Sequence, residues 1–249
     1  MNAQNPQILE ELGITSPWLN VPGFLGYLPP VHLDMLVKLG AFLPPPLSLI
    51  SRNPAVTRMS IPFPGGVLMR TGLPNPGLSA ALHQYSQRWS RLAVPLWLSF
   101  LPRNAAEAQE MSERVDELEF AVTFQVLLPR GMSAQEKSVL LAAVQGEKPF
   151  FVELPLDEIC RETVGMIQKS GASGIIVSAP RGCLPVGDQW ISGRLYGPML
   201  YAQAALAVET LVKGNLTVIA GCGIGSMDQG TALLKLGAAA VQMDMVLWA

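Results

Sequence analysis

"TVIAGCGIGSMDQGTALLKLGAAAVQMD", residues 217–244, joins two short apolar runs through a glycine-rich turn and a helical pattern. The runs cover residues 216–221 and 239–244, and the helical pattern covers residues 227–236. Uninterrupted apolar runs are typical of strands that are buried on both faces of a parallel sheet. The stretch therefore predicts a strand, a crossover helix and a second strand parallel to the first.

The same alternation of strand and helix patterns runs through the rest of the chain. We expect eight strands, at residues 18–21, 41–43, 94–100, 120–127, 149–154, 174–178, 216–221 and 239–244. We expect helices at residues 31–39, 77–89, 105–114, 133–144, 157–170, 197–213 and 227–236. One helix start is marked by Ser133 and Glu136, which have the spacing of a capping box.

A chain of 249 residues has the usual length of one barrel of eight β/α units. The expected fold is therefore α/β, a (β/α)8 TIM barrel, with a single domain over residues 1–249. An open, doubly wound sheet is the alternative, but its phosphate fingerprint G-x-G-x-x-G does not follow the first strand.

Two segments depart from a regular barrel. Residues 44–70 contain six prolines and the pair Gly65-Gly66, so they predict a loop with a short hairpin, inserted after the second strand at the catalytic end. A barrel normally has a helix after its eighth strand, whereas this sequence stops at Ala249. We expect this helix to be missing or truncated, with the N-terminal segment or a partner covering the first and last strands.

Composition excludes several classes of function. With 17 basic and 19 acidic residues, the net charge of -2 gives no basic stripe for nucleic acid. Charged residues make up 14% of the chain, against roughly 25% in an average soluble domain, which favours a homo-oligomer or a hetero-complex. No run of about 18 apolar residues predicts a membrane span, and the N-terminus does not read as a secretory signal.

The three cysteines, Cys160, Cys183 and Cys222, are far apart in the sequence and lack metal-ligand spacing. They are typical of reduced thiols in a cytoplasmic protein. We therefore expect a cytoplasmic location and no metal site.

Several motifs resemble the dihydroorotate dehydrogenase family, its class 1 form in particular. They are "RTGLPNPGL" at residues 70–78, "ISGRLYGPMLYAQAALAVETL" at residues 191–211 and "SRNPAVTR" at residues 51–58. Their order and spacing extend the resemblance over nearly the whole chain. It implies a β/α barrel that carries FMN over its strand ends and transfers hydride from dihydroorotate to the flavin.

The positions at which the family's chemistry is carried differ here. The resemblance places Pro45 where the family has a lysine that meets the flavin, and Met69 where it has a substrate asparagine. It places Leu128 at the catalytic base and Glu153 at a second lysine. Leucine cannot accept a proton, and general-base catalysis is worth roughly 10²–10⁴ in rate. We therefore expect no catalytic residue in the family's sense.

The family's phosphate site is retained only in part. The resemblance places it at Gly193, Arg194, Gly197, Cys222 and Gly223, with Arg194 and Cys222 where the family has smaller residues. Backbone N–H groups can hold a phosphate without particular side chains, but Asp244 at the end of the eighth strand would repel it. The expectation is that no cofactor binds, with FMN as the alternative.

Three residues are candidates for contacts with a substrate or an anion: Asn75, Arg130 and Glu153. Arg130 could clamp an anion, although a solvated loop charge is the more common role of such a residue. Glu153 is expected to form a structural ion pair with Arg130 or Arg181.

Three hypotheses about function follow. The first is a catalytically inactive, dihydroorotate dehydrogenase-like barrel that serves as a structural or assembly subunit, because base, lysines and substrate asparagine are replaced together. The second is an FMN-dependent oxidoreductase of this family that acts on another substrate. The third is a sensor that binds the phosphate of a small metabolite at residues 193–197 and 221–223.

Overall fold

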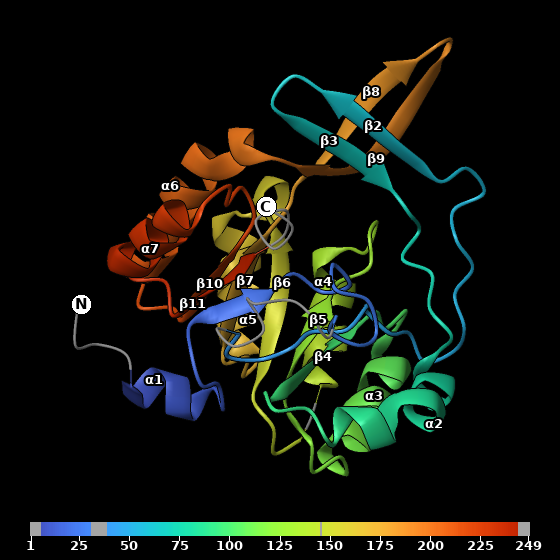
Figure 1. Cartoon of the computed structure of the whole chain (residues 1–249), viewed down its shortest axis with the longest axis vertical. Helices are drawn as coiled ribbons and strands as arrows, with labels where there is room; N and C mark the ends of the chain where they lie inside the picture. The colour runs from blue at the N-terminus through green and yellow to red at the C-terminus, as the bar shows by residue number, and fades with distance from the viewer. Residues whose placement is uncertain (1–5, 31–38, 145, 244–249) are drawn as a thin grey trace.

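The computed structural model describes residues 6–30, 39–144 and 146–243 and contains a curled sheet of seven parallel strands (Figure 1). Their order is β1-β11-β10-β7-β6-β5-β4. In that order the strands are Trp18–Asn20, Ala240–Met243, Val218–Gly221, Gly174–Ser178, Phe150–Pro155, Ala121–Leu127 and Leu96–Phe100.

Two single bridges between the edges of this sheet close it into a barrel. Leu19 of β1 pairs in parallel with Ala41, and Phe42 pairs in parallel with Leu96 of β4. The expected second strand is thus present as two bridging residues, and the predicted (β/α)8 barrel is confirmed.

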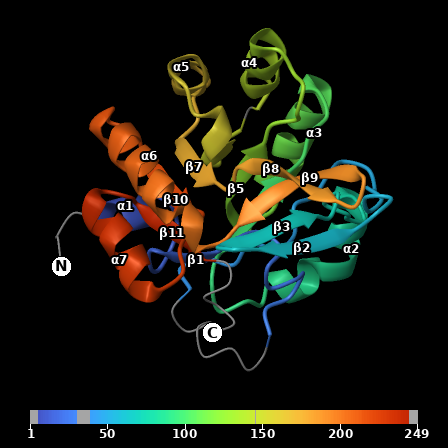
Figure 2. The same cartoon turned by 90° about the horizontal axis from the view of Figure 1, so that it is seen from above.

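Helices surround the barrel at the positions expected for crossovers (Figure 2). They are α2 (Leu78–Trp89), α3 (Ala105–Asp116), α4 (Ala134–Ala142), α5 (Arg161–Lys169), α6 (Tyr201–Lys213) and α7 (Met227–Leu236). The capping box of Ser133 and Glu136 is formed, and α7 has the predicted bounds. The helix predicted at 31–39 falls, except for its last residue, outside the described residues, as does the expected end of the barrel beyond residue 243.

Two of the predicted helices are each divided in two. Extended backbone at Ile159 and Cys160 separates the 3-10 turn η2 (Leu156–Glu158) from α5. Pro198 opens another 3-10 turn, η3 (Pro198–Leu200), which leads into α6. A short N-terminal helix, α1 (Pro6–Glu11), was not predicted.

A second sheet, of four antiparallel strands, projects beyond the barrel (Figures 1 and 2). In the order β2-β3-β9-β8 its strands are Met59–Phe63, Gly66–Arg70, Gln189–Tyr196 and Arg181–Val186. The hairpin β2–β3 is the one predicted in the proline-rich insertion. The hairpin β8–β9 was not predicted, although Gly187-Asp188 between two alternating segments is a two-residue hairpin signal.

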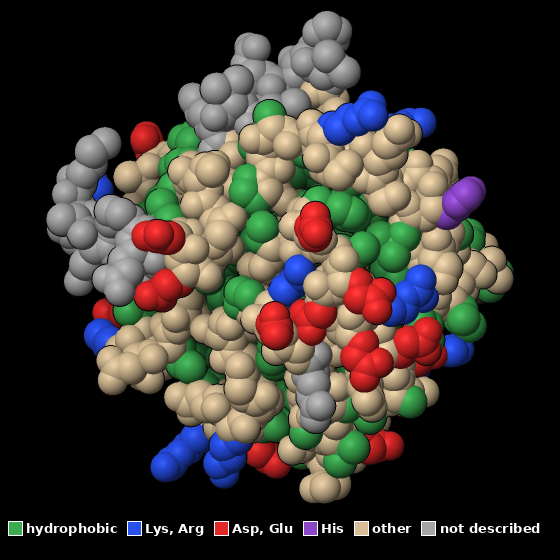
Figure 3. Space-filling view, turned by 90° about the horizontal axis from the view of Figure 1, so that it is seen from below, with side chains coloured by type: hydrophobic (Ala, Val, Ile, Leu, Met, Phe, Trp, Pro, Cys, Tyr) green, Lys and Arg blue, Asp and Glu red, His purple; other side chains and the backbone are tan. Residues whose placement is uncertain are grey.

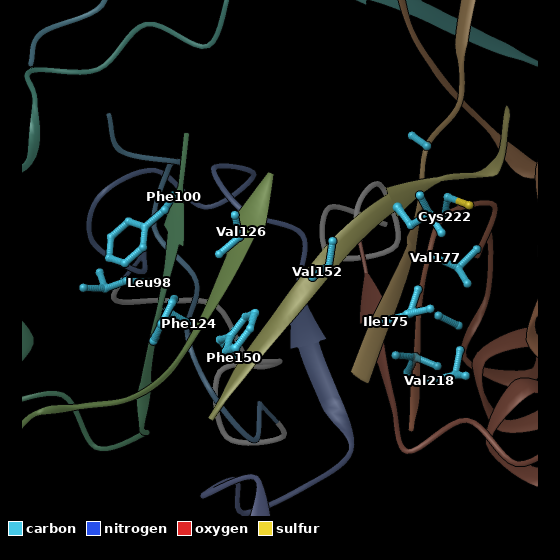
Figure 4. Packing of buried hydrophobic residues seen from close by; sticks show 14 of the residues in the cluster. Leu98, Phe100, Phe124, Val126, Phe150, Val152, Ile175, Val177, Val218 and Cys222 are labelled. Atoms are coloured by element: carbon cyan, nitrogen blue, oxygen red, sulfur yellow. The ribbon is translucent and has the colours of Figure 1, made fainter. Parts of the chain in front are cut away.

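The barrel strands are apolar on both faces because helices cover the outside and the strands themselves enclose the inside. On the outer face, Leu98 and Phe100 of β4, Phe124 of β5 and Phe150 and Val152 of β6 pack under the helices (Figure 4). The alternating residues form a separate inner cluster, which includes Leu19, Trp97, Phe151, Ile176 and Ile219.

The N-terminal segment packs with this inner cluster. Leu12 and Ile14 belong to it, and the Thr123 hydroxyl of β5 donates a hydrogen bond to the Leu12 carbonyl at 3.2 Å. These contacts are with the barrel interior and β5, so the expected cover of the outer face of the first and last strands stays a prediction. In the ranges that the structure describes, no helix has the length and hydropathy needed to cross a membrane.

Phe151→Ala tests the inner cluster. Phe151 is fully buried and stacks on Trp97 with a centroid separation of 5.5 Å, so the substitution should cost about 3–5 kcal/mol of unfolding free energy. Urea denaturation measures this loss, and Phe63→Ala on the half-buried strand β2 should cost far less. Equal losses for the two variants would contradict the assignment of the barrel core.

Candidate functional site

A polar layer lies above the apolar inner cluster, at the carboxyl ends of the barrel strands. Side chains alternate along a strand, so Ser99, Glu153 and Ser178 lie on the same inner face as Trp97, Phe151 and Ile176, two residues earlier. The buried polar residues at this end of the barrel are Asn20, Ser99, Gln125, Glu153, Ser178 and Gln242. The barrel mouth is therefore a buried polar environment.

Hydrogen bonds link three of these side chains across the mouth. The Gln242 amide donates to the Gln125 carbonyl oxygen at 2.9 Å, and the Gln125 amide donates to the Glu153 carboxylate at 3.0 Å. The other Glu153 oxygen forms an ion pair with the guanidinium of Arg194, which comes from β9 of the antiparallel sheet. The chain Gln242–Gln125–Glu153–Arg194 thus joins the barrel to the second sheet.

The Glu153 carboxylate stabilises the charged form of Arg194. Both side chains are largely buried, with 17% of Arg194 and 5% of Glu153 exposed. Burial disfavours the charged guanidinium, but the Glu153 carboxylate outweighs burial and, together with Tyr196, raises the pKa of Arg194 above its ordinary value. Arg194 is consequently a permanent cation at the mouth.

The structural ion pair expected for Glu153 is formed with an arginine, but not with either of the two that were named. We expected Arg130 or Arg181, whereas the partner is Arg194. The error follows from the unpredicted strand β9, because only the pairing of β9 with β3 brings Arg194 over the barrel.

The other sequence-predicted residues around the mouth lie on two levels. Leu127, which precedes the position of the family's base, is buried and lines the mouth, and Leu128 is half-buried. Pro45, Met69 and Arg130 line a wider cleft above it, under the antiparallel sheet. Arg130 and Met69 therefore line the same cleft, and Met69 pairs with Arg194, the residue that links this cleft to the polar layer.

The side chain of Asn75 is hydrogen-bonded within the protein. Its side-chain oxygen accepts hydrogen bonds from the Ser48 N–H, the Ser48 hydroxyl and the Gly77 N–H at 3.0–3.1 Å, and its amide donates to the Leu73 carbonyl. These four bonds fix the proline-rich segment to the start of α2. In the described part of the chain, Asn75 is thus committed to this junction.

The glycines of the predicted phosphate site lie where backbones pack closely. A Cβ at Gly193 would lie 2.6 Å from the Met69 carbonyl oxygen, and one at Gly223 would lie 2.6 Å from the Tyr201 nitrogen. Gly197 has a φ of 146° and lies against Gly65 in the β2–β3 turn. Packing alone accounts for these three glycines.

The remaining two residues of that predicted site are also engaged within the protein. Cys222 is 2% exposed and packs in the outer core (Figure 4). Arg194 is paired with Glu153, as described above. Asp244, whose charge entered the same prediction, lies outside the described residues.

The space at the mouth is small. The cavity bounded by Leu127, Glu153, Ser178, Arg194 and Gln242 has a volume of about 30 Å³, enough for one or two water molecules. Pockets for drug-sized ligands and cofactors span about 300–1,000 Å³. The cavity at the mouth is therefore smaller than such a ligand, whereas the cleft above it, which shares Arg194 and Tyr196 with it, has a volume of about 810 Å³. In the described ranges there is also no group of three or more metal-ligating side chains.

Glu153→Met and Arg194→Met test the buried pair. Either single substitution leaves one charge without its partner, which costs roughly 3–5 kcal/mol, whereas removing both leaves neither. The double variant should therefore lose less stability in urea denaturation than the sum of the two single variants. Additive losses would show that the two side chains do not interact.

No protein-family model and no curated protein matches the chain. Among solved structures, DHODH from Eimeria tenella, in complex with ferulenol, is similar with a TM-score of 0.67 and 17% identity, over 94% of this chain and 78% of that one. FabK from Thermotoga maritima, as an M276A mutant, is similar with a TM-score of 0.53 and 13% identity, over 97% of this chain and 64% of that one. At these identities the likeness concerns the fold, and the chain has the α/β TIM-barrel fold found in DHODH and FabK.

Proposed function

We propose that this chain is a dihydroorotate dehydrogenase-like barrel that has lost flavin-dependent catalysis and serves as a structural or assembly subunit. The observation that carries the proposal is the Glu153–Arg194 pair, which occupies the barrel mouth together with Gln125 and Gln242. An ion pair at this depth is stable only while both partners are present. A ligand at the mouth would have to displace Arg194 and leave Glu153 without its cation.

The side chains at the strand ends support the same proposal. β5 ends at Leu127 and is followed by Leu128, and neither side chain can accept a proton. By the resemblance, this is the segment that holds the base in the dihydroorotate dehydrogenase family. A chain with this segment lacks the residue that would begin oxidation of a carbon acid.

Exposed apolar side chains support a role in assembly. Leu206 on the outer face of α6 is 65% exposed, and Met199 of η3 and Leu236 of α7 are also exposed. Met199 lies just before α6, and α7, which carries Leu236, is in contact with α6. An apolar surface on adjacent helices is typical of a contact with another subunit.

The alternative is an FMN-dependent oxidoreductase that acts on another substrate. The fold likeness to DHODH favours it. It requires a different position of Arg194 when FMN is bound, so the two proposals differ in one measurable property, which is the binding of FMN.

Titration of the purified protein into FMN separates them. We expect the purified protein to be colourless and not to bind FMN in the barrel mouth, because Arg194 fills the mouth. A companion variant, Glu153→Lys with Arg194→Gly, removes the ion pair and restores the residue types that the resemblance assigns to these positions. A flavin spectrum close to one FMN per unmodified chain would refute the proposal.

Sedimentation velocity tests the assembly surface. We expect the protein alone to sediment as an oligomer, and Leu206→Glu to shift it towards the monomer because a carboxylate cannot be buried unpaired in an apolar contact. Val139→Glu is the matched control, since Val139 is a similarly exposed apolar residue on α4, outside this surface. A monomer at every concentration would exclude self-assembly and leave only a complex with a different protein.

A further inference from the structure

The wider cleft under the antiparallel sheet has an unusual set of charges. It has a volume of about 810 Å³ and lies between the sheet, the proline-rich loop and the loops after β1, β5 and β7. Six arginines line it: Arg52, Arg58, Arg70, Arg130, Arg181 and Arg194. No aspartate or glutamate of the described ranges is among its lining residues.

Most of these positive charges have no carboxylate to offset them. Apart from Arg194, none of the six forms an ion pair with any residue that the structure describes. Asp157 is close to Arg181, but its carboxylate accepts a hydrogen bond from the backbone N–H of Arg181. Glu158 is held by Lys137 at 2.7 Å. Asp157 and Glu158 therefore offset part of the charge of Arg181 without forming an ion pair with it.

The arginines are also close enough to repel one another. Burial lowers the pKa of Arg181 to about 10; the charges of Arg130 and Arg194 act in the same direction, and those of Asp157 and Glu158 oppose them less strongly. Like charges that are held together in a partly buried site are destabilising until an anion lies between them. The cleft thus carries an excess of positive charge, which a bound anion would offset.

Arg194 supplies a second observation, independent of the number of charges. It lies between the small cavity and the cleft, and lines both of them. Its Nε is buried and has no hydrogen-bond partner within residues 6–30, 39–144 and 146–243. A buried guanidinium donor without a partner costs free energy, which a bound acceptor would recover.

The opposite end of the molecule does not share this charge pattern. Seen from below, acidic and basic side chains are interspersed, and several acidic ones gather near the centre (Figure 3). The cleft, by contrast, is lined by six arginines and no acidic residue of the described ranges, in a chain whose net charge is -2.

The cleft also offers apolar surface beside the arginines. Phe24, Met69, Trp190 and Tyr196 line it, and Trp190 is 72% exposed. Its volume is within the range of small-molecule sites, and guanidinium groups bind phosphate and carboxylate oxygens through paired hydrogen bonds. We propose that this cleft binds a small organic polyanion, which carries phosphate groups or several carboxylates on an apolar or aromatic body.

Isothermal titration calorimetry of the full chain tests this proposal with four probes: ATP, tripolyphosphate, citrate and adenosine. We expect at least one of the three polyanions to bind, more weakly as the salt concentration rises, and uncharged adenosine not to bind. Tripolyphosphate and citrate distinguish phosphate from carboxylate recognition, and ATP against tripolyphosphate measures the contribution of the aromatic body.

Arg130→Gln with Arg181→Gln should weaken this binding at least about tenfold, because two charge-assisted contacts are lost. The matched control is Arg88→Gln with Arg91→Gln, which removes the same charge from exposed positions that do not line the cleft. Binding should also change the tryptophan fluorescence, and Trp190→Phe should remove that signal while calorimetry still detects the ligand. Failure of all three polyanions to bind, or equal weakening in the two double variants, would overturn the proposal.

Discussion

The carboxylate of Glu153 sets the main constraint on this structure. The alternation of side chains in β6 places residue 153 inside the barrel, where a charge is stable only beside a counter-charge. None of the barrel strands that the structure describes contains a lysine or arginine. Arg194 supplies the counter-charge from β9, so the antiparallel sheet is held at the barrel mouth by the chemistry of one interior position.

The position of that sheet then decides what the mouth can accept. With Arg194 drawn down onto Glu153, the interior site shrinks to the size of a water molecule or two, and the open volume lies above it, among arginines. In a barrel the strand ends normally present the chemistry. Here only a small cavity remains at the strand ends, and the wider cleft is lined mainly by residues of the loops and hairpins that follow them.

The sequence indicates the barrel well because local patterns determine most of it. Each barrel strand is an apolar run because its own residues are buried. The apolar residues of α7 are periodic because one face of the helix packs on the core. The site was less predictable, because it depends on long-range pairing: the contact of Glu153 with Arg194 exists only once β9 pairs with β3. Gly187-Asp188 could have revealed the hairpin, but nothing in the sequence indicates which arginine it delivers. Asn75 illustrates the reverse case, since a family motif suggested a ligand contact where local geometry needs a turn.

The antiparallel sheet is assembled from two hairpins that lie far apart in the chain, one before α2 and the other after β7. The two hairpins pair through β3 and β9, which the folding of the barrel strands between them brings together. Contacts between such distant segments form slowly because loop closure costs entropy. The sheet is therefore expected to be among the last parts of the chain to fold. Before the sheet docks, Arg194 is not yet beside the Glu153 carboxylate. We therefore expect the Glu153–Arg194 ion pair and the arginine-lined cleft to form together, in a late step of folding.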